Sequence, residues 1–484
     1  MYSITKHVSG SNPRAAARSW MVLQLLLGGG LWASLVPGAF ADEPVRAAPV
    51  VIAEYVRAGL DANLSLANQT LEFQKSVAAL DAARARFYPD LSFNARYTRA
   101  SGGRQIDLPL GQLLNPAYQT LNELLAASGG AARFPVVGDE SIPLQLPREQ
   151  DTRISLRQPL YAPAIPAAVD AARAASQATD YAHQAFARAL RRDITVAYLD
   201  WLRARNAAQI IAASVALLAE NLRVNTSQYE NGKITRDAVL RAQTEWLTVQ
   251  QQQHDADNAT LQARSYVNFL VNRPLESPLE AAAIDSSLIA PTTLPPLETA
   301  THDALATRPE LQQLQQAQQA AEAQVRVARA ARKPTLAFGI DAGTQGSDYG
   351  IGHNYNFVTA SLVVNWTLFD AGARAASESQ ARLARRQLDN DQQLSSAHIE
   401  LEVRQAHDSL RSAIDSLVTA QARAAAAQAG FTLASRRRDA GLASQLEFLD
   451  ARNALTSAEL NENLTRCAWL QRQAEYDFAR GATP

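Results

Sequence analysis

Two carboxylates that follow a glycine turn are the residues best suited to chemistry in this sequence. Glu447 and Asp450 are three residues apart, so a helix places them on one face, shortly after Gly441. Paired carboxylates concentrate negative potential and attract cations. The ordinary alternative is that acids in the first turns of a helix stabilise its dipole and are solvated. Both interpretations stay open from these residues alone.

Enzyme chemistry has no comparable support. The chain of 484 residues has one cysteine, Cys467, so neither an intramolecular disulfide nor a zinc site with several cysteines is possible. The seven histidines occur singly, without His-Glu-x-x-His spacing. No nucleophile and base are recognisably paired. We therefore expect no catalytic, cofactor-binding or metal site, and the net charge of -1 gives no reason to expect a nucleic-acid partner.

The elements that position these residues occur twice along the chain. Tyr88-Pro89-Asp90-Leu91 and Gln158-Pro159-Leu160-Tyr161 have counterparts in Lys333-Pro334-Thr335-Leu336 and Trp366-Thr367-Leu368-Phe369. The offset is 208 residues from Leu160 to Leu368 and 209 from Gly232 to Gly441. Such a constant offset indicates an internal repeat. We predict one structural repeat over residues 42–285 and a second over 286–484.

Four short segments alternate apolar and polar residues, and they are expected strands at about 91–100, 152–161, 335–344 and 356–369. Each is about as long as a tilted strand that crosses a bilayer, with one apolar face. A half-buried sheet in a soluble protein has the same pattern. The aromatic residues at the strand ends indicate an interfacial belt, although packing of helix on strand would also place them there: Phe87, Tyr88, Tyr161, Trp366 and Phe369.

Two very long helices connect these strands to glycine turns. Neither proline nor glycine occurs between Ala167 and Gln228 or between Arg374 and Ala429, which allows helices about 90 Å long. Apolar residues repeat at alternating steps of four and three, as in helices that supercoil. The first series is Leu190, Ile194, Ala197, Trp201, Ala204, Ala208, Ile211, Val215, Leu218 and Leu222; the second is Ile399, Val403, Ala406, Leu410, Ala413, Leu417, Ala420, Ala424, Ala427 and Phe431. Gly232 and Gly441 suit positions just past a helix end.

The remaining segments follow from local signals. Residues 1–41 are a predicted signal peptide: Lys6, Arg14 and Arg18 precede an apolar run that ends in Ala39-Phe40-Ala41, and cleavage changes the net charge to -4. Shorter helices are expected at 51–62, 64–86, 235–271, 309–331 and 444–479, with a proline-punctuated join at 272–296. The loop at 101–151, with a helical piece near 118–127, is 37 residues longer than its counterpart between the last two strands.

Four strands cannot close a barrel in lipid, so several copies must share one. The duplicated motifs, together with Tyr229 to Gly232, Asn268-Phe269-Leu270, Arg308-Pro309-Glu310-Leu311 and Asp370-Ala371-Gly372, make the mature chain resemble the TolC family of outer-membrane channels. The resemblance implies a mixed α and β membrane protein, a homotrimer with a twelve-stranded barrel in Gram-negative outer-membrane lipid and a helical coiled-coil tunnel in the periplasm. It implies the exit duct of a tripartite efflux pump or a type I secretion system, with a periplasmic adaptor and an inner-membrane transporter as partners. The alternative is a soluble periplasmic coiled-coil scaffold or adaptor without a barrel.

The resemblance also implies roles for residues near the turns. It places Glu447 and Asp450 in an acidic ring at the inner aperture of the tunnel. It makes Arg438, the last of three consecutive arginines, the candidate gating contact, and Gly232 and Gly441 the hairpin tips where an adaptor docks.

Overall fold

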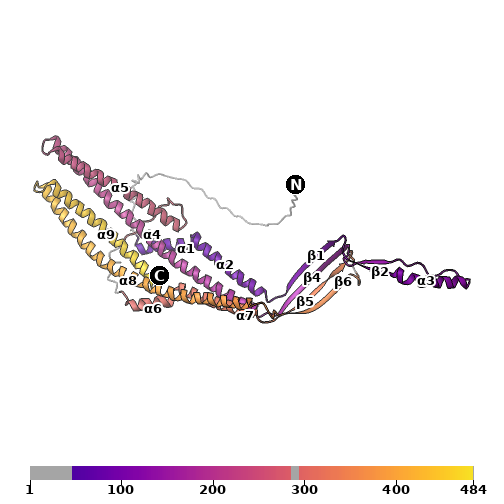
Figure 1. Cartoon of the computed structure of the whole chain (residues 1–484). Coiled ribbons are helices and arrows are strands. Elements are labelled where there is room, and N and C mark those ends of the chain that lie inside the picture. The colour runs from indigo at the N-terminus through magenta and orange to yellow at the C-terminus, as the bar shows by residue number, and fades with distance from the viewer. Residues whose placement is uncertain (1–45, 285–293, 351, 483–484) are drawn as a thin grey trace, which may run out of the picture. The chain divides into compact units, whose positions relative to one another are not determined.

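The computed structural model describes residues 46–284, 294–350 and 352–482, and the predicted signal peptide lies outside them. This part of the chain contains nine α-helices and two antiparallel sheets. The helices are α1 Ala48–Ala62, α2 Leu64–Ala85, α3 Leu110–Ala127, α4 Ala164–Glu230, α5 Arg236–Leu270, α6 Leu297–Thr307, α7 Pro309–Ala330, α8 Ala373–Asp439 and α9 Gln445–Ala479 (Figure 1). The strands are β1 Asp90–Arg99, β2 Gln105–Leu108, β3 Glu140–Pro143, β4 Arg148–Tyr161, β5 Thr335–Gly346 and β6 Asn356–Asn365.

The four predicted strands form one sheet in the order β1-β4-β5-β6, with every neighbouring pair antiparallel. Two boundaries were wrong, because β4 begins at Arg148 and not at residue 152, and β6 ends at Asn365 and not at residue 369. Asn365 pairs with Thr335, the first residue of β5, so the following residues have no partner strand. The chain instead turns into α8 through Ala371 and Gly372, both with positive φ.

The register places the predicted apolar residues of all four strands on one face of the sheet. Leu91 pairs with Leu156, which pairs with Ile340 and through it with Ala360. Directly opposed residues share a face, so each pairing extends an apolar row across the sheet. The next row is Phe93, Ile154, Ala342 and Val358. Residues of this face are exposed in the single chain, Phe93 by 68% and Val358 by 77%.

The two longest helices carry the predicted heptad series on their packed sides. Helices α4 and α8 have 67 residues each, about 100 Å of continuous helix. All ten residues of the first series, and all ten of the second, are buried or half-buried. Helix α4 packs along α5 and α7, and α8 packs along α9 and α7. The prediction of apolar seams for helix packing is confirmed.

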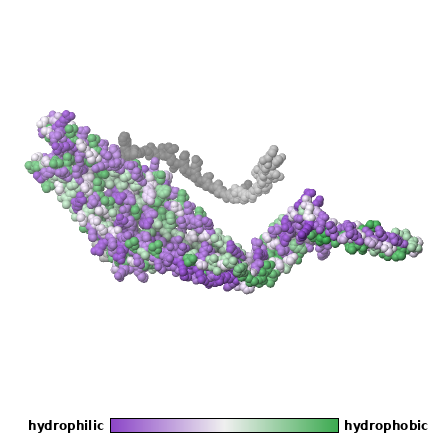
Figure 2. All heavy atoms as spheres, in the orientation of Figure 1, coloured by the Kyte–Doolittle hydropathy of each residue, from purple (hydrophilic) through white to green (hydrophobic). Residues whose placement is uncertain are grey.

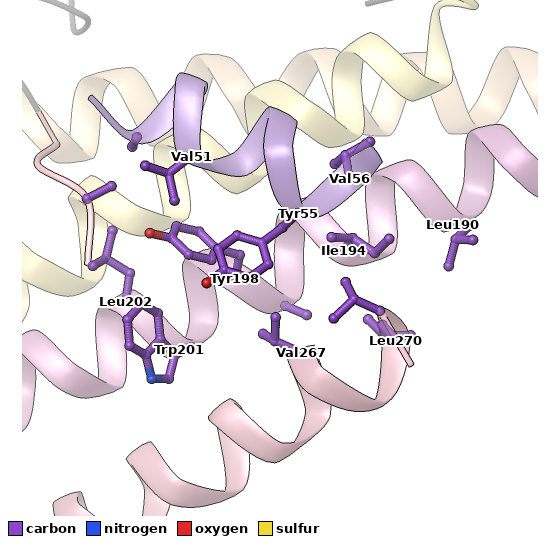
Figure 3. Packing of buried hydrophobic residues seen from close by; sticks show 14 of the residues in the cluster. Val51, Tyr55, Val56, Leu190, Ile194, Tyr198, Trp201, Leu202, Val267 and Leu270 are labelled. Carbon is purple, nitrogen blue, oxygen red and sulfur yellow. The ribbon is translucent and has the colours of Figure 1, made fainter. Parts of the chain in front are cut away.

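The largest apolar cluster joins α1, α4 and the end of α5 (Figure 3). The rings of Tyr55 and Tyr198 stack at 5.4 Å, and the Trp201 ring lies 5.4 Å from Tyr198 at a tilt of 51°. Both hydroxyls bind the backbone of Glu280, since Tyr198 donates to its carbonyl at 2.8 Å and its N–H donates to Tyr55 at 3.0 Å. The segment that follows α5 is therefore fixed to the helical core.

Two segments differ from the prediction. The loop at 101–151 contains the β2–β3 hairpin, and α3 begins at Leu110 rather than near Tyr118, because Pro116 lies inside the helix without ending it. Helix α6 was not predicted; it has only 11 residues, and Pro296 and Pro309 bound it closely.

Candidate functional site

The two predicted hairpin tips have the same backbone geometry. Gly232 follows α4 with φ +72°, and Gly441 follows α8 with φ +73°, a region that other residues rarely adopt. The N–H of Gly232 donates to Tyr229 at 2.8 Å, and that of Gly441 donates to Arg438 at 2.9 Å. The next residue in each turn donates back to the carbonyl five residues earlier. Each helix therefore ends in a Schellman motif, which satisfies the last carbonyls.

Glu447 lies in the first turn of α9 and is held within its own chain. Arg437 Nη1 donates to Glu447 Oε1 at 2.7 Å, and Arg437 Nη2 donates to the Leu442 carbonyl at 3.3 Å. The backbone N–H of Glu447 donates to Ser444 Oγ at 3.2 Å, which caps the helix. Both ion-pair partners are more than 40% exposed, so the pair contributes at most about 1 kcal/mol.

Asp450 follows on the same side of α9 and is exposed. Among the described residues, its carboxylate has no hydrogen bond or ion pair. The two predicted acids are therefore unequal: Glu447 is paired with Arg437, whereas no cation among the described residues pairs with Asp450.

Arg438 contacts a different part of the turn. Its guanidinium lies 3.8 Å from the centre of the Phe448 ring and pairs with Asp439 at 3.1 Å. Phe448 is 1% exposed and packs against Phe431 of α8. Arg438 thus covers the apolar contact that joins α8 to α9, while Arg437 is the arginine that reaches the turn and the acid.

The predicted interfacial aromatics lie at one end of the sheet. Tyr88 precedes β1, Tyr161 ends β4, and Trp366 and Phe369 follow β6. The register brings these termini together, because Tyr161 pairs with Leu336 and Asn365 with Thr335. All four aromatic side chains are exposed, from 46% for Tyr161 to 85% for Phe369. Trp366 also donates its Nε1–H to the Arg332 carbonyl at 3.1 Å, which fixes its ring at the join of helix and strand.

Comparison with known families shows which family has this arrangement. The profile of a family described as outer membrane efflux protein matches residues 148–273 and 300–482. The chain belongs to this family. The assignment agrees with the resemblance seen in the sequence and rejects the alternative of a soluble scaffold. This outer membrane efflux protein is a channel protein of the Gram-negative outer membrane, with a long periplasmic helical portion.

Solved structures of similar fold agree with the family. The Campylobacter jejuni CmeC outer membrane channel has a TM-score of 0.73 at 14% identity, over 89% of this chain and 85% of that chain. The open state of the Neisseria gonorrhoeae MtrE outer membrane channel has a TM-score of 0.70 at 17% identity, over 89% of both chains. The Vibrio cholerae outer membrane protein VceC has a TM-score of 0.69 at 16% identity, over 89% of this chain and 96% of that chain. No curated protein matches the sequence.

One charged cluster of the efflux protein was not predicted from the sequence. Arg308 precedes α7, is 5% exposed, and binds Glu310 at 2.8 Å and Glu402 of α8 at 2.5 Å. Burial lowers the pKa of Arg308, but its hydrogen bonds to both glutamates raise it more, so the net direction is upward. Burial likewise raises the pKa of Glu310, and Arg308 lowers it more. The guanidinium also lies 5.2 Å from the Phe478 ring of α9, so it ties three helices together.

The Arg308 cluster had a signal in the sequence. Arg308 and Glu310 flank a proline at a helix start, where an arginine two residues before an acid is free to fold back onto it. The sequence does not indicate the third partner, Glu402, because it lies 94 residues after Arg308.

Proposed function

We propose that three copies of this efflux protein close one twelve-stranded barrel. The observation that carries the proposal is the four-stranded sheet, in which β1 and β6 are edge strands within the described chain. An edge exposed to lipid leaves backbone groups without partners, at a cost of several kcal/mol each. Three sheets joined edge to edge remove all such edges.

The directions of the strands support closure. Neighbouring strands alternate in direction and their number is even, so β6 of one copy meets β1 of the next as an antiparallel pair. The exposed apolar rows suit a lipid-facing surface. The opposite face carries Arg96, Arg153 and Asp341 with Ser155 and Asn94, and such a polar face suits a water-filled lumen.

The membrane-crossing role belongs to these strands rather than to a helix. Within the described residues, α4 is long and apolar enough to cross a membrane by length and composition. Its apolar series instead packs in the cluster with α1 and α5, through Ile194, Ala197 and Trp201. We assign α4 and α8, with α5 and α9, to the tunnel that extends into the periplasm.

The two halves of the tunnel support the proposed repeat at residues 42–285 and 286–484. Every member of the second heptad series lies 209 residues after its counterpart in the first, from Leu190 and Ile399 to Leu222 and Phe431. The tips keep this offset, and their hydrogen bonds are equivalent. A duplicated hairpin in three copies gives six hairpins around the tunnel.

The partners follow from the family at the general level. We propose that the trimer is the exit duct of a tripartite efflux pump or a type I secretion system, with a periplasmic adaptor and an inner-membrane transporter. The tips at Gly232 and Gly441 are the proposed adaptor contacts. A groove of about 240 Å³ between α8 and α9 near the second tip, lined by Phe431, Leu433 and Ala451, offers apolar surface for an adaptor helix.

At the inner end of the tunnel we propose a ring of acids, Glu447 and Asp450 from each chain, with Arg438 as the gating contact. The inequality of the two acids makes Asp450 the principal source of free negative charge. The proposal as a whole is tested by adding purified protein to planar lipid bilayers. Discrete conductance steps are expected, and protein that stays in solution without conductance would contradict it.

A further inference from the structure

Helix α3 carries an apolar face that the described chain leaves largely exposed. Its opposite contact is well defined: Asn115 exchanges two hydrogen bonds of 2.8 Å with the backbone of Val137, and Asn122 binds the backbone of Phe134. The Tyr118 and Phe134 rings lie 5.2 Å apart. The helix is therefore held against the returning segment 131–139 on one side.

The uncovered face is a leucine stripe with coiled-coil spacing. Leu110, Leu114, Ala117, Leu121 and Leu124 follow one another at steps of four, three, four and three. In the stripe Leu114, Leu121 and Leu124 are exposed by 38%, 41% and 63%, and Leu113 beside it is exposed by 69%. Figure 2 shows hydrophobic surface over the segment that carries α3. This spacing is typical of a helix that packs against other helices.

The connection of α3 places it at the loop end of the sheet, away from the aromatic residues (Figure 1). The β1–β4 ladder continues into the β2–β3 hairpin, because Ala100 donates to Pro147 at 3.1 Å and Leu144 donates to Arg104 at 2.9 Å. Twelve strands about 4.8 Å apart and tilted by about 40° give a barrel radius of about 12 Å. Strands β2 and β3 are four residues long, about 13 Å, which is comparable to this radius.

We infer that the three α3 helices of the trimer pack on one another through the leucine stripe and cap the outer mouth of the barrel. The inference rests on the proposed trimer. Each chain carries α3 in the loop that is enlarged by 37 residues. The threefold axis therefore gives each α3 two identical partner helices. The cap buries the exposed leucines without requiring another protein.

The charge of α3 argues for copies of itself and against a lipid surface. Helices that lie on membranes carry Lys and Arg on their polar face, which bind anionic headgroups. Helix α3 has neither, and its single charged residue is Glu123. The side away from the leucine stripe is instead polar, with Gln112, Gln119 and the single acid Glu123, as suits a helix exposed to water.

Cysteine cross-linking of the full-length protein tests the cap. Leu121→Cys places a thiol in the stripe, and the matched control Gln119→Cys places one about 160° around the same helix. The native Cys467 is buried, and burial raises its pKa to about 11, so it does not interfere. Under mild oxidation, linked dimers of Leu121→Cys should form about tenfold faster than those of Gln119→Cys, because only the stripe is shared between copies.

Native mass measurement on the same samples separates the possible failures. A trimer in which both variants link at the same rate overturns the cap but leaves the channel intact. A monomer in unmodified protein overturns the proposed trimer and the cap with it. If Leu121→Cys alone fails to assemble, Leu114→Cys replaces it. A fluorophore can also be attached to the new thiol of the Leu121→Cys variant. Quenching of this fluorophore by spin-labelled lipids would place α3 on the membrane and overturn the cap.

Discussion

Arg437 of α8 and Glu447 of α9 form a 2.7 Å ion pair across the turn at Gly441. The same guanidinium binds the Leu442 carbonyl, so it joins the end of one helix to the start of the next. The pair satisfies Glu447 inside one chain and leaves Asp450 free. The two acids of the proposed ring should therefore differ in their effect on ions.

The first prediction concerns cation block of the channel. Asp450→Asn should weaken block by a trivalent cation by at least about fivefold, because even one pair of unit charges about 4 Å apart in water contributes about 1 kcal/mol. Glu447→Gln should have a smaller effect, because Arg437 already offsets that charge. Single-channel recordings in planar bilayers measure both. Unchanged block in a variant that lacks both acids would reduce them to residues that stabilise the start of α9.

A second prediction concerns gating by Arg438. Replacing Arg438 by Ala removes the contact with Phe448, worth about 0.5 to 2 kcal/mol, and should raise the open probability of the channel. Arg436→Ala is the matched control, because its side chain is exposed and lies on the same turn of α8. If the two variants gate alike, Arg438 is not the gating contact.

The third prediction tests the faces of the sheet. Leu362 lies on the apolar face opposite Phe338, and Ser361 lies on the other face opposite Gly339. Leu362→Arg should reduce the amount of protein in the outer membrane, because charge on the lipid face costs about 2 to 4 kcal/mol near the midplane. Ser361→Arg should insert normally, since Gly339 leaves room and the lumen is wet. Equal insertion of both would show that the faces are assigned wrongly.

A fourth prediction concerns the buried Arg308 cluster. Arg308→Met removes the cation that binds Glu402 and leaves Glu310 with only the longer pair to Arg188 at 3.8 Å, and it should destabilise the helical part by about 3 to 5 kcal/mol. The exposed pair of Arg472 and Glu475 provides the control, and Arg472→Met should change the denaturation midpoint little. Comparable shifts in the two variants would contradict a structural role for the cluster.

The same cluster predicts a dependence on pH. The pKa of Glu310 is lowered on folding from its ordinary value of 4.5. The stabilisation is therefore complete above that value and is lost as pH falls through the lower folded pKa. Denaturation midpoints between pH 7 and pH 3 should fall less steeply for Glu310→Gln than for unmodified protein. Parallel curves would remove Glu310 as a contributor.

The hydrophobic periodicity of the sequence predicted most of the fold. The heptad series and the absence of proline defined α4 and α8 within a few residues, because long regular helices depend on many small, consistent local preferences. Boundaries at special backbone positions were harder. The end of β6 depends on where its partner β5 begins, and this tertiary fact is not present in the β6 sequence. Pro116 lies inside α3, and the helix is held by Asn115 and Asn122, which bind the backbone of the returning segment.

The candidate site was only partly accessible from the sequence. Both turn glycines were identified, because positive φ is a local demand. The different contacts of Arg437 with Glu447 and of Arg438 with Phe448 were not predicted, since they depend on how each side chain reaches α9. The Arg308 cluster was missed for the same reason, as its partners come from α7, α8 and α9.

The most direct test of the account is the native mass of the purified mature protein in mild detergent. We predict a complex of three chains, because the four-stranded sheet has two edges that must be paired in lipid. The complex should persist when the detergent concentration is raised moderately. A monomer that remains folded and inserted in the membrane would contradict the shared barrel, and with it the proposed channel.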